Sequence, residues 1–435
     1  MKNYEQYKRM VKFAFGIIIL SLEMILYWYV WLNYYNGMME IPYNRTGHWL
    51  MVAVYGIFLV LFNLLYGGLK IGAIRTGNMI YSQTLATICA NALSYLLITL
   101  LTKHFQSVLP LIGVTGTEFL VISIWSVICT RVYRWFYPAR NVLLIYGEHP
   151  VASLMGKIHS RNDRFVVGEI VHISAGIEAI EKKIDQYEGI VICDIPSQMR
   201  NRILKYCYGK SIRTYTTLKI SDILLRNAES LHLFDTPLLL SRNAGFTFEQ
   251  RFVKRAMDIV LSLIAVILLS PIFLITAIAI KLYDGGPVFY CQDRCTKDGK
   301  VFSIYKFRSM IVDAEKNGKS MPAIDKDPRI TPVGNIIRAT RIDELPQILN
   351  ILKGDMSIVG PRPERVEHVE LYSKQIPEFP YRMKVKGGLT GYAQVYGKYN
   401  TSAYDKLKLD LMYIQNYSLL LDIELIFKTV KILFM

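Results

Sequence analysis

The sequence predicts a membrane α-helical bundle followed by two domains of mixed α/β structure, and three observations predict this class. Apolar residues make up 52% of the 435-residue chain, yet its formal net charge is +16. Long apolar runs lie in the first third of the chain, whereas most charges come later. A short β-α-β pattern begins near residue 141. We therefore expect a four-helix transmembrane domain over 1–137, a degenerate Rossmann-like α/β domain over 138–245 and an α+β domain over 246–435.

Four apolar runs predict the transmembrane bundle, because each approaches the roughly 20 residues that cross the hydrocarbon of a bilayer. The runs are Val11–Leu32, Trp49–Leu65, Met79–Leu101 and Leu109–Thr130. Basic residues gather before the first run, between the second and third, and after the fourth, which places both ends of the bundle in the cytoplasm. Glu23 interrupts the first run, and we expect it to face a partner helix or a small cavity.

The basic balance is compatible with nucleic acid, an anionic bilayer surface or phosphorylated substrates as partners. No aromatic-basic RNA motif accompanies the charge, so we predict membrane lipids and phosphorylated substrates and no nucleic acid. The six cysteines are scattered without the spacing of a zinc site, which favours reduced thiols.

The second domain begins with Val142–Gly147, which is typical of a buried parallel strand that ends in a turn. Ile177–Tyr187 is expected to be helical, and Gly189–Asp194 is expected to be a second strand. The first turn, 147–152, lacks the second and third glycines of a dinucleotide-binding motif, and Pro150 removes a donor N–H. A structural or regulatory domain is therefore favoured over a working dinucleotide site.

The segment 252–282 is long enough to cross a membrane, but Ser270-Pro271 interrupts it midway. Basic clusters flank both of its ends, and a full span would put one of them outside. A re-entrant helix that is kinked at Ser270-Pro271 keeps both clusters on the cytoplasmic side, and Ser270 can satisfy the carbonyl that proline leaves free. A fifth full span is the alternative. The apolar tail, 419–434, is too charged to span and suits a helix at the interface or packed on the domain.

Residues 285–398 hold an acidic pair, Asp343-Glu344, in a basic frame. Lys306 and Arg308 lie on one face of an extended segment, and the arginines 338, 341 and 362 offer guanidinium groups suited to phosphate. The loop Gly387–Gly391 could point backbone N–H groups at an anion. Each piece also has a plain explanation, as a solvated face, a helix-surface pair or a turn. Together they favour metal-assisted chemistry on a phosphorylated substrate at a membrane surface.

These motifs carry a resemblance to a known family. Roughly 251–435 resembles the catalytic domain of bacterial polyprenyl-phosphate phosphoglycosyl transferases, and the bundle and α/β domain resemble the long form of that family. The matching motifs include Lys254–Asp258, the Ser270-Pro271 break, Gly286–Phe289, Gln292–Arg294, Lys306–Met310, Asp343–Gln347, Gly354–Pro363, Gly388–Gln394 and Asp410–Ile414.

The resemblance implies transfer of a sugar 1-phosphate from a UDP-sugar to polyprenyl (undecaprenyl) phosphate with release of UMP. It implies that Asp343 is a covalent nucleophile and that Glu344 helps to hold Mg²⁺, so the expected metal ligands are Asp343 and Glu344. Arg362, between Pro361 and Pro363, is expected to bind phosphate or nucleotide, and Lys398 is expected to add a positive charge there. Lys306, Arg308 and Arg341 are expected to stabilise charge during transfer.

The resemblance also implies a multi-pass protein of the bacterial cytoplasmic membrane that initiates exopolysaccharide, capsule, O-antigen or glycoprotein glycan assembly. A homodimer is expected by analogy alone. Two rival hypotheses are a membrane-tethered sugar-nucleotide dehydratase or epimerase that uses NAD in the second domain, and a non-catalytic scaffold of a polysaccharide assembly complex.

Overall fold

The computed structural model describes residues 5–147, 151–241, 245–312, 314, 327–398 and 401–433. Its residues form two compact units, 1–218 and 219–435. The first unit joins the helical bundle to a parallel sheet, and the second contains the acidic pair. The predicted division at residue 245 differs from this one, because the segment after 218 packs with the second unit.

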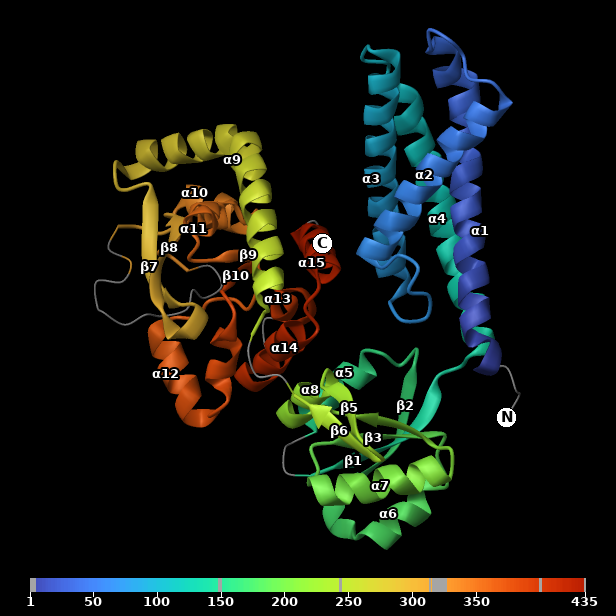
Figure 1. Cartoon of the computed structure of the whole chain (residues 1–435), viewed down its shortest axis with the longest axis vertical. Helices are drawn as coiled ribbons and strands as arrows, with labels where there is room; N and C mark the ends of the chain where they lie inside the picture. Colours follow the sequence, from blue (N-terminus) through green and yellow to red (C-terminus); the bar gives the residue numbers. More distant parts are fainter. Residues whose placement is uncertain are drawn as a thin grey trace. The chain divides into compact units, whose positions relative to one another are not determined.

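Four long helices form the bundle (Figure 1). They are α1 (Lys8–Val30), α2 (Arg45–Tyr66), α3 (Thr76–Thr102) and α4 (Leu109–Phe136). The four predicted runs coincide with them, except that Trp31 and Leu32 lie in a π-helical turn after α1. Five helices in the described ranges are long and apolar enough to cross a membrane, these four and Phe248–Asp284.

The interior of the bundle contains two buried carboxylates. Glu23 on α1 accepts a hydrogen bond from Thr87 on α3 at 2.7 Å, which confirms that it faces a partner helix. Glu118 on α4 accepts from Tyr55 at 2.9 Å and from Asn91 at 2.7 Å. Neutral donors on neighbouring helices thus hydrogen-bond both acids where water is excluded, although Oε1 of Glu23 is buried and has no partner among the described residues.

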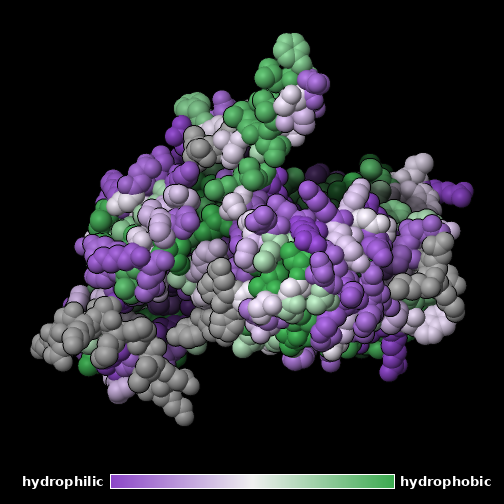
Figure 2. Space-filling view, turned by 90° about the horizontal axis from the view of Figure 1, so that it is seen from below, coloured by the Kyte–Doolittle hydropathy of each residue, from purple (hydrophilic) through white to green (hydrophobic). Residues whose placement is uncertain are grey.

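A four-stranded parallel sheet in the order β2-β1-β3-β4 follows the bundle. Its strand β1 is central, and Val142–Ile145 within it are fully buried, as a parallel strand covered on both faces requires. Figure 2 views the protein from below, where α6 and α7 lie in Figure 1, and the surface over these two helices is largely hydrophilic. The elements are β1 (Arg140–Tyr146), α5 (Ala152–His159), β2 (Phe165–His172), α6 (Ile177–Ile184), β3 (Gly189–Cys193), α7 (Ser197–Gly209) and β4 (Arg213–Thr216).

The parallel sheet confirms the expected α/β character of this region, including the two strands and the helix that the sequence predicted. Residues 148–150 of the predicted first turn lie outside the described residues. Gly147 is required where it stands, because a side chain there would meet the backbone oxygen of Asp194 at 2.5 Å.

In its described residues, the second unit combines helices with three two-stranded sheets. Strands β5 and β6 pair antiparallel, as do β7 and β8, whereas β9 and β10 pair parallel. The strands are β5 (Glu229–Leu233), β6 (Thr236–Leu240), β7 (Phe289–Cys295), β8 (Val301–Phe307), β9 (Ser357–Val359) and β10 (Gly388–Thr390). The helices are α8 (Ile220–Arg226), α9 (Phe248–Asp284), α10 (Pro332–Ala339), α11 (Gln347–Lys353), α12 (Val366–Gln375), α13 (Tyr392–Tyr396), α14 (Ala403–Gln415) and α15 (Leu419–Leu433).

Helix α9 is sharply bent, and Figure 1 shows two arms that meet near its middle. Pro271 lies inside the helix, where it cannot donate to the carbonyl of Ile267 four residues earlier. The hydroxyl of Ser270 donates to that carbonyl at 2.8 Å and so replaces the missing hydrogen bond. The expected kink and the expected role of Ser270 are therefore present.

The tail forms α15, which packs on the domain through Leu425. That residue is fully buried against Val359 and Tyr413. Of the two alternatives left open for the tail, the structure supports packing on the domain.

Candidate active site

The acidic pair lies on a single 3-10 turn, Ile342–Glu344, between α10 and α11. Arg341 directly before it adopts a left-handed backbone conformation with φ of 59°. This conformation is uncommon for a residue with a side chain, and it reverses the chain sharply after α10. The turn thus presents both carboxylates between two helices.

Glu344 is held by two cations that come from distant parts of the unit. Lys306 on β8 donates to Glu344 Oε1 at 2.9 Å, and Arg362 donates to the same oxygen at 2.6 Å and to Oε2 at 3.4 Å. The Glu344 side chain is only 13% exposed. Burial raises its pKa, but Arg362 and Lys306 outweigh burial and hold that pKa well below its usual range. Glu344 is therefore a fixed anion.

Asp343 has a different environment from its neighbour. Its Oδ1 is buried and has no hydrogen-bond partner among the described residues. Burial raises the pKa of Asp343 and the Glu344 carboxylate raises it further, against the effect of Lys306, Arg338 and Arg341. The pKa values of the two adjacent acids therefore differ, and the pKa of Asp343 is the higher one. A basic carboxylate with a free lone pair is suited to nucleophilic attack.

Arg362 is positioned through its backbone by a residue that sequence reasoning missed. Arg382 donates to the carbonyl of Arg362 at 2.9 Å and forms an ion pair with Asp410 at 2.8 Å. Both members of this pair are buried, and burial raises the pKa of Asp410 to about 6. Asp410 stands within a motif that matched the family, which is the signal that could have indicated a structural role.

The loop at Gly387 and Gly388 does not turn its N–H groups toward an anion. Gly387 donates to the Thr296 hydroxyl at 3.1 Å, and Gly388 donates to the carbonyl of Pro361 at 2.9 Å. A side chain on Gly388 would meet the backbone nitrogen of Gly360 at 2.1 Å. The glycine therefore permits close packing of β10 on the segment that leads to Arg362, and the expectation of an anion-binding loop is wrong for these two groups.

The structure brings Asp343, Glu344, Lys306 and Arg362 together, and Pro361 and Pro363 are buried on either side of Arg362. Arg308 instead forms a two-pronged ion pair with Asp284 at the end of α9, with Nη1 at 2.9 Å from Oδ2. Lys398 is exposed, and its side chain contacts none of these four residues in the described ranges.

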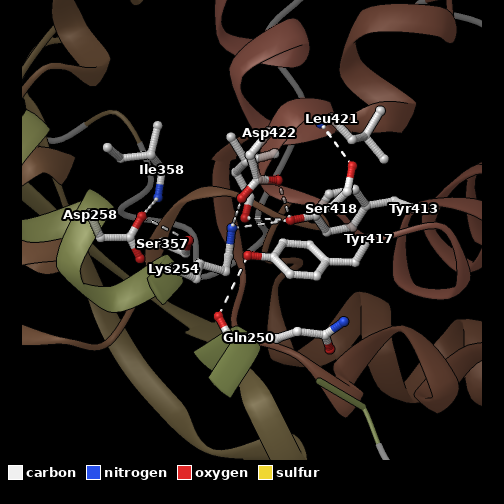
Figure 3. Close-up of polar contacts among 11 residues, drawn as sticks. Gln250, Lys254, Asp258, Ser357, Ile358, Tyr413, Tyr417, Ser418, Leu421 and Asp422 are labelled. Atoms are coloured by element: carbon white, nitrogen blue, oxygen red, sulfur yellow. Dashed lines mark hydrogen bonds and ion pairs between the residues drawn. The ribbon is translucent and has the colours of Figure 1, made fainter. Parts of the chain in front are cut away.

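A buried polar network fixes the first arm of α9 to the rest of the unit (Figure 3). Lys254 on α9 donates to Asp422 on α15 at 2.5 Å and to the Tyr413 hydroxyl at 3.1 Å, and Tyr413 donates to Asp422 at 2.8 Å. One turn later, Asp258 accepts from the backbone of Ile358 at 2.9 Å. The network therefore holds α9 against the strand that leads to Arg362.

The residues of the acidic pair fit a magnesium ion only in part. Asp343 offers a free buried oxygen, and a carboxylate oxygen is the ligand that Mg²⁺ prefers. Both oxygens of Glu344 are engaged by cations, which oppose a further positive charge. Within the described residues, no group of three or more His, Cys, Asp or Glu side chains forms a metal site.

Comparison with known proteins yields consistent matches. Residues 249–435 match the family described as bacterial sugar transferase. The chain is 42% identical over 233 residues to the UDP-N-acetylgalactosamine-undecaprenyl-phosphate N-acetylgalactosaminephosphotransferase of Aeromonas hydrophila, covering 53% of this chain and 54% of that protein. It is 44% identical over 203 residues to the UDP-glucose:undecaprenyl-phosphate glucose-1-phosphate transferase of Escherichia coli K12, covering 46% and 42%.

A shorter relative is covered over most of its length. The exopolysaccharide production protein ExoY of Sinorhizobium fredii is 38% identical over 191 residues, which cover 41% of this chain and 83% of that protein. The chain spans about half the length of the two longer relatives that it matches.

Proposed function

The chain belongs to the bacterial sugar transferase family, and from this premise we propose that it transfers a sugar 1-phosphate from a UDP-sugar to polyprenyl phosphate and releases UMP. The observation that carries the proposal is the asymmetry of the acidic pair. Glu344 is neutralised by Lys306 and Arg362, whereas the neighbouring Asp343 keeps a free buried oxygen and a raised pKa. Such a pair supplies one nucleophile and one fixed anion.

In the proposed reaction, a carboxylate oxygen of Asp343 attacks the β-phosphorus of the UDP-sugar. The bond between that phosphorus and the bridging oxygen breaks, and UMP leaves with the electron pair. An oxygen of the lipid phosphate then attacks the phosphorus of the aspartyl-phosphosugar and breaks the bond to Asp343. The free carboxylate returns, and the product is a polyprenyl diphosphate sugar. A covalent step allows one site to serve a soluble donor and a lipid acceptor in turn.

The remaining residues of the site position the pair and counter phosphate charge. Arg362 is 39% exposed, so part of its guanidinium is accessible to a phosphate oxygen. Mg²⁺, when bound, would neutralise phosphate charge, and Asp343 is the residue here that would hold it. Glu344 would take part in metal binding only if its contacts with the two cations loosened.

We place the site at the cytoplasmic face of the bacterial inner membrane, in keeping with the basic flanks of the four bundle helices. The bend of α9 supports a re-entrant helix, in which Ser270 and Pro271 lie at the deepest point. Such a helix would bring the acidic pair to the depth of the lipid phosphate. The Rossmann-like character of the second domain and a homodimer stay predictions.

Replacement of Asp343 by Asn tests the proposal. We expect UMP release in the presence of polyprenyl phosphate and Mg²⁺ to fall by about 1,000-fold or more, because the amide is a poor nucleophile. Radiolabelled sugar phosphate should be trapped on the wild type without acceptor and be absent from the variant. The control is Asp298→Asn, since Asp298 is exposed and lies on a left-handed turn that Asn tolerates.

Full activity of the Asp343→Asn protein would refute the covalent mechanism. The donors in the assay should include UDP-N-acetylgalactosamine and UDP-glucose, which the names of the two longer relatives contain. Turnover of one donor would identify the sugar together with the reaction.

A further inference from the structure

The first unit contains a cavity of about 790 Å³ where the starting residues of α1 and the last turn of α4 meet the sheet. Its lining is strongly positive and rich in aromatic rings. The cations are Lys8, Lys12, Arg134, Arg140, Arg164, Lys210 and Arg213, whereas the acids are Glu5, Asp163 and Glu188. Seven positive groups thus face three negative ones.

Ion pairs already engage two of the three acids and part of the positive lining. Glu5 forms ion pairs with both Arg140 and Arg213. Asp163 pairs with Arg161 at 3.0 Å, and Arg161 does not line the cavity. Little negative charge therefore remains for the other cations of the lining.

Four of the cations have no ion pair with any residue in the described ranges. They are Lys8, Lys12, Arg134 and Arg164. The Lys8 ammonium lies 5.2 Å from the centre of the Tyr137 ring, and the Lys12 ammonium lies 5.4 Å from that of Tyr133. A ring face attracts a cation more weakly than a carboxylate does, so the positive charge of the cavity stays largely uncompensated.

Hydrogen bonds join two loops that contribute residues to the lining of the cavity. Arg75, at the start of α3, donates to the carbonyl of Ser160 at 2.7 Å. Arg161 donates to the carbonyl of Ala73 at 2.8 Å. Both contacts join the loop between α2 and α3 to the loop between α5 and β2, so contacts within the protein hold these two parts of the lining together.

We propose that this cavity binds a ligand that carries a phosphate group, with Lys8, Lys12 and Arg164 as its main cationic contacts. Ammonium and guanidinium groups are the side chains that bind phosphate in proteins. The volume exceeds that of a single phosphate and accommodates a larger molecule against the rings. The ligand would supply the negative charge that the described residues lack.

Two kinds of phosphate-bearing ligand are compatible with the position of the cavity, a lipid headgroup and a soluble nucleotide. Lys8 begins α1 and Phe136 ends α4, and both helices are apolar enough to cross a membrane, so a lipid headgroup would lie within reach. Trp135 at the rim is 78% exposed, as an aromatic side chain at headgroup depth often is. A soluble nucleotide is the other source. The proposal does not depend on the transferase activity, because its residues lie outside 249–435.

The test uses the full chain and two probes. One variant carries Lys8→Gln, Lys12→Gln and Arg164→Gln, and the matched control carries Arg9→Gln, Arg131→Gln and Lys182→Gln. The control removes the same charge from exposed residues of the same unit that do not line the cavity. The exposed single variant Arg164→Glu serves if the triple variant does not fold.

The first probe is phosphatidylglycerol, and native mass spectrometry counts the molecules that remain on the protein after release from nanodiscs. The second probe is UDP, titrated by calorimetry in neutral detergent. With one of the two probes, we expect the wild type and the control to bind at the cavity, seen as retained lipid or as a second set of UDP sites. We expect the triple variant to retain about tenfold less lipid, or to bind UDP at that second set with about tenfold lower affinity. Loss with the lipid identifies a headgroup ligand, and loss with UDP identifies a nucleotide. Equal binding of both probes by all three proteins would overturn the proposal.

Discussion

The two units both concentrate positive charge, but they neutralise it differently. In the second unit, several buried or half-buried cations have carboxylate partners, as in the pairs Lys254–Asp422, Lys306–Glu344 and Arg382–Asp410. In the first unit, Lys8 and Lys12 have only ring faces. A cation that is paired with a carboxylate fixes the position of that acid before any substrate binds. A cation without such a partner is available to bind an anionic ligand. Removal of a cation should therefore have opposite effects in the two units.

The largest expected effect comes from the buried network of the second unit. Asp422→Asn leaves the buried Lys254 ammonium without its ion-pair partner, so we expect a loss of about 3–5 kcal/mol in the free energy of unfolding. Thermal unfolding of the full chain in detergent should show the corresponding transition roughly 10 °C lower. The double replacement Lys254→Met with Asp422→Leu should recover much of that loss, because it removes both members of the ion pair and leaves neither charge unpaired. An unchanged transition in Asp422→Asn would mean that Lys254 is hydrated.

An intermediate effect is expected at the acidic pair. Lys306→Met removes a cation that lowers the pKa of Asp343, so that pKa should rise further above its usual value. Because only the ionised carboxylate attacks, the acidic limb of the pH profile of kcat/KM should move to higher pH. At neutral pH we expect a loss of roughly tenfold to hundredfold in kcat/KM, or about 1.4–2.8 kcal/mol.

The control for this variant is Lys353→Met, since Lys353 is exposed and lies 3.7 Å from Asp355. It should leave the pH profile in place. A shift of the acidic limb to lower pH in Lys306→Met would contradict the assignment of Asp343 as the ionising group.

The smallest expected effect is a gain in stability, in contrast to the loss expected for Asp422→Asn. Lys8→Met removes one of several like charges in the cavity of the first unit, so we expect a gain of up to about 1 kcal/mol in stability in neutral detergent. Phosphatidylglycerol should raise the unfolding temperature of the wild type more than that of the variant. A loss of stability in neutral detergent would show that the contacts of Lys8 with the aromatic rings outweigh its repulsion by the other cations, and the contrast between the two units would then fail.

Much of the architecture could be predicted from local patterns in the sequence. The bundle helices and the strand at 142–146 follow from long or continuous apolar runs, and the kink of α9 follows from one proline. Strand β2 was missed because Gly168 and Glu169 interrupt its apolar run. Local patterns thus identify elements whose burial is uniform, and they fail where one strand mixes buried and exposed residues.

For the site, the sequence predicted the residues that lie in motifs with charged side chains. It did not predict the pairs that only tertiary packing brings together. The sequence predicted one cluster that contains Asp343, Glu344, Lys306 and Arg362, and these residues do lie close together in the structure. The pairing of Arg308 with Asp284, and of Lys254 with Asp422 across 168 positions of sequence, arises from tertiary packing. No sequence spacing encodes such pairs, so their residues looked like free cations or a charged tail.

If α9 is re-entrant as proposed, its bend has a consequence for the bilayer itself. A straight span occupies area in both leaflets, but a helix that turns back at Pro271 would occupy area in the cytoplasmic leaflet alone. In the proposed placement, each copy of the chain would therefore widen one leaflet relative to the other. The lateral pressure of that leaflet would act on the two arms of the helix, and through Lys254 it would act on the domain that holds the acidic pair.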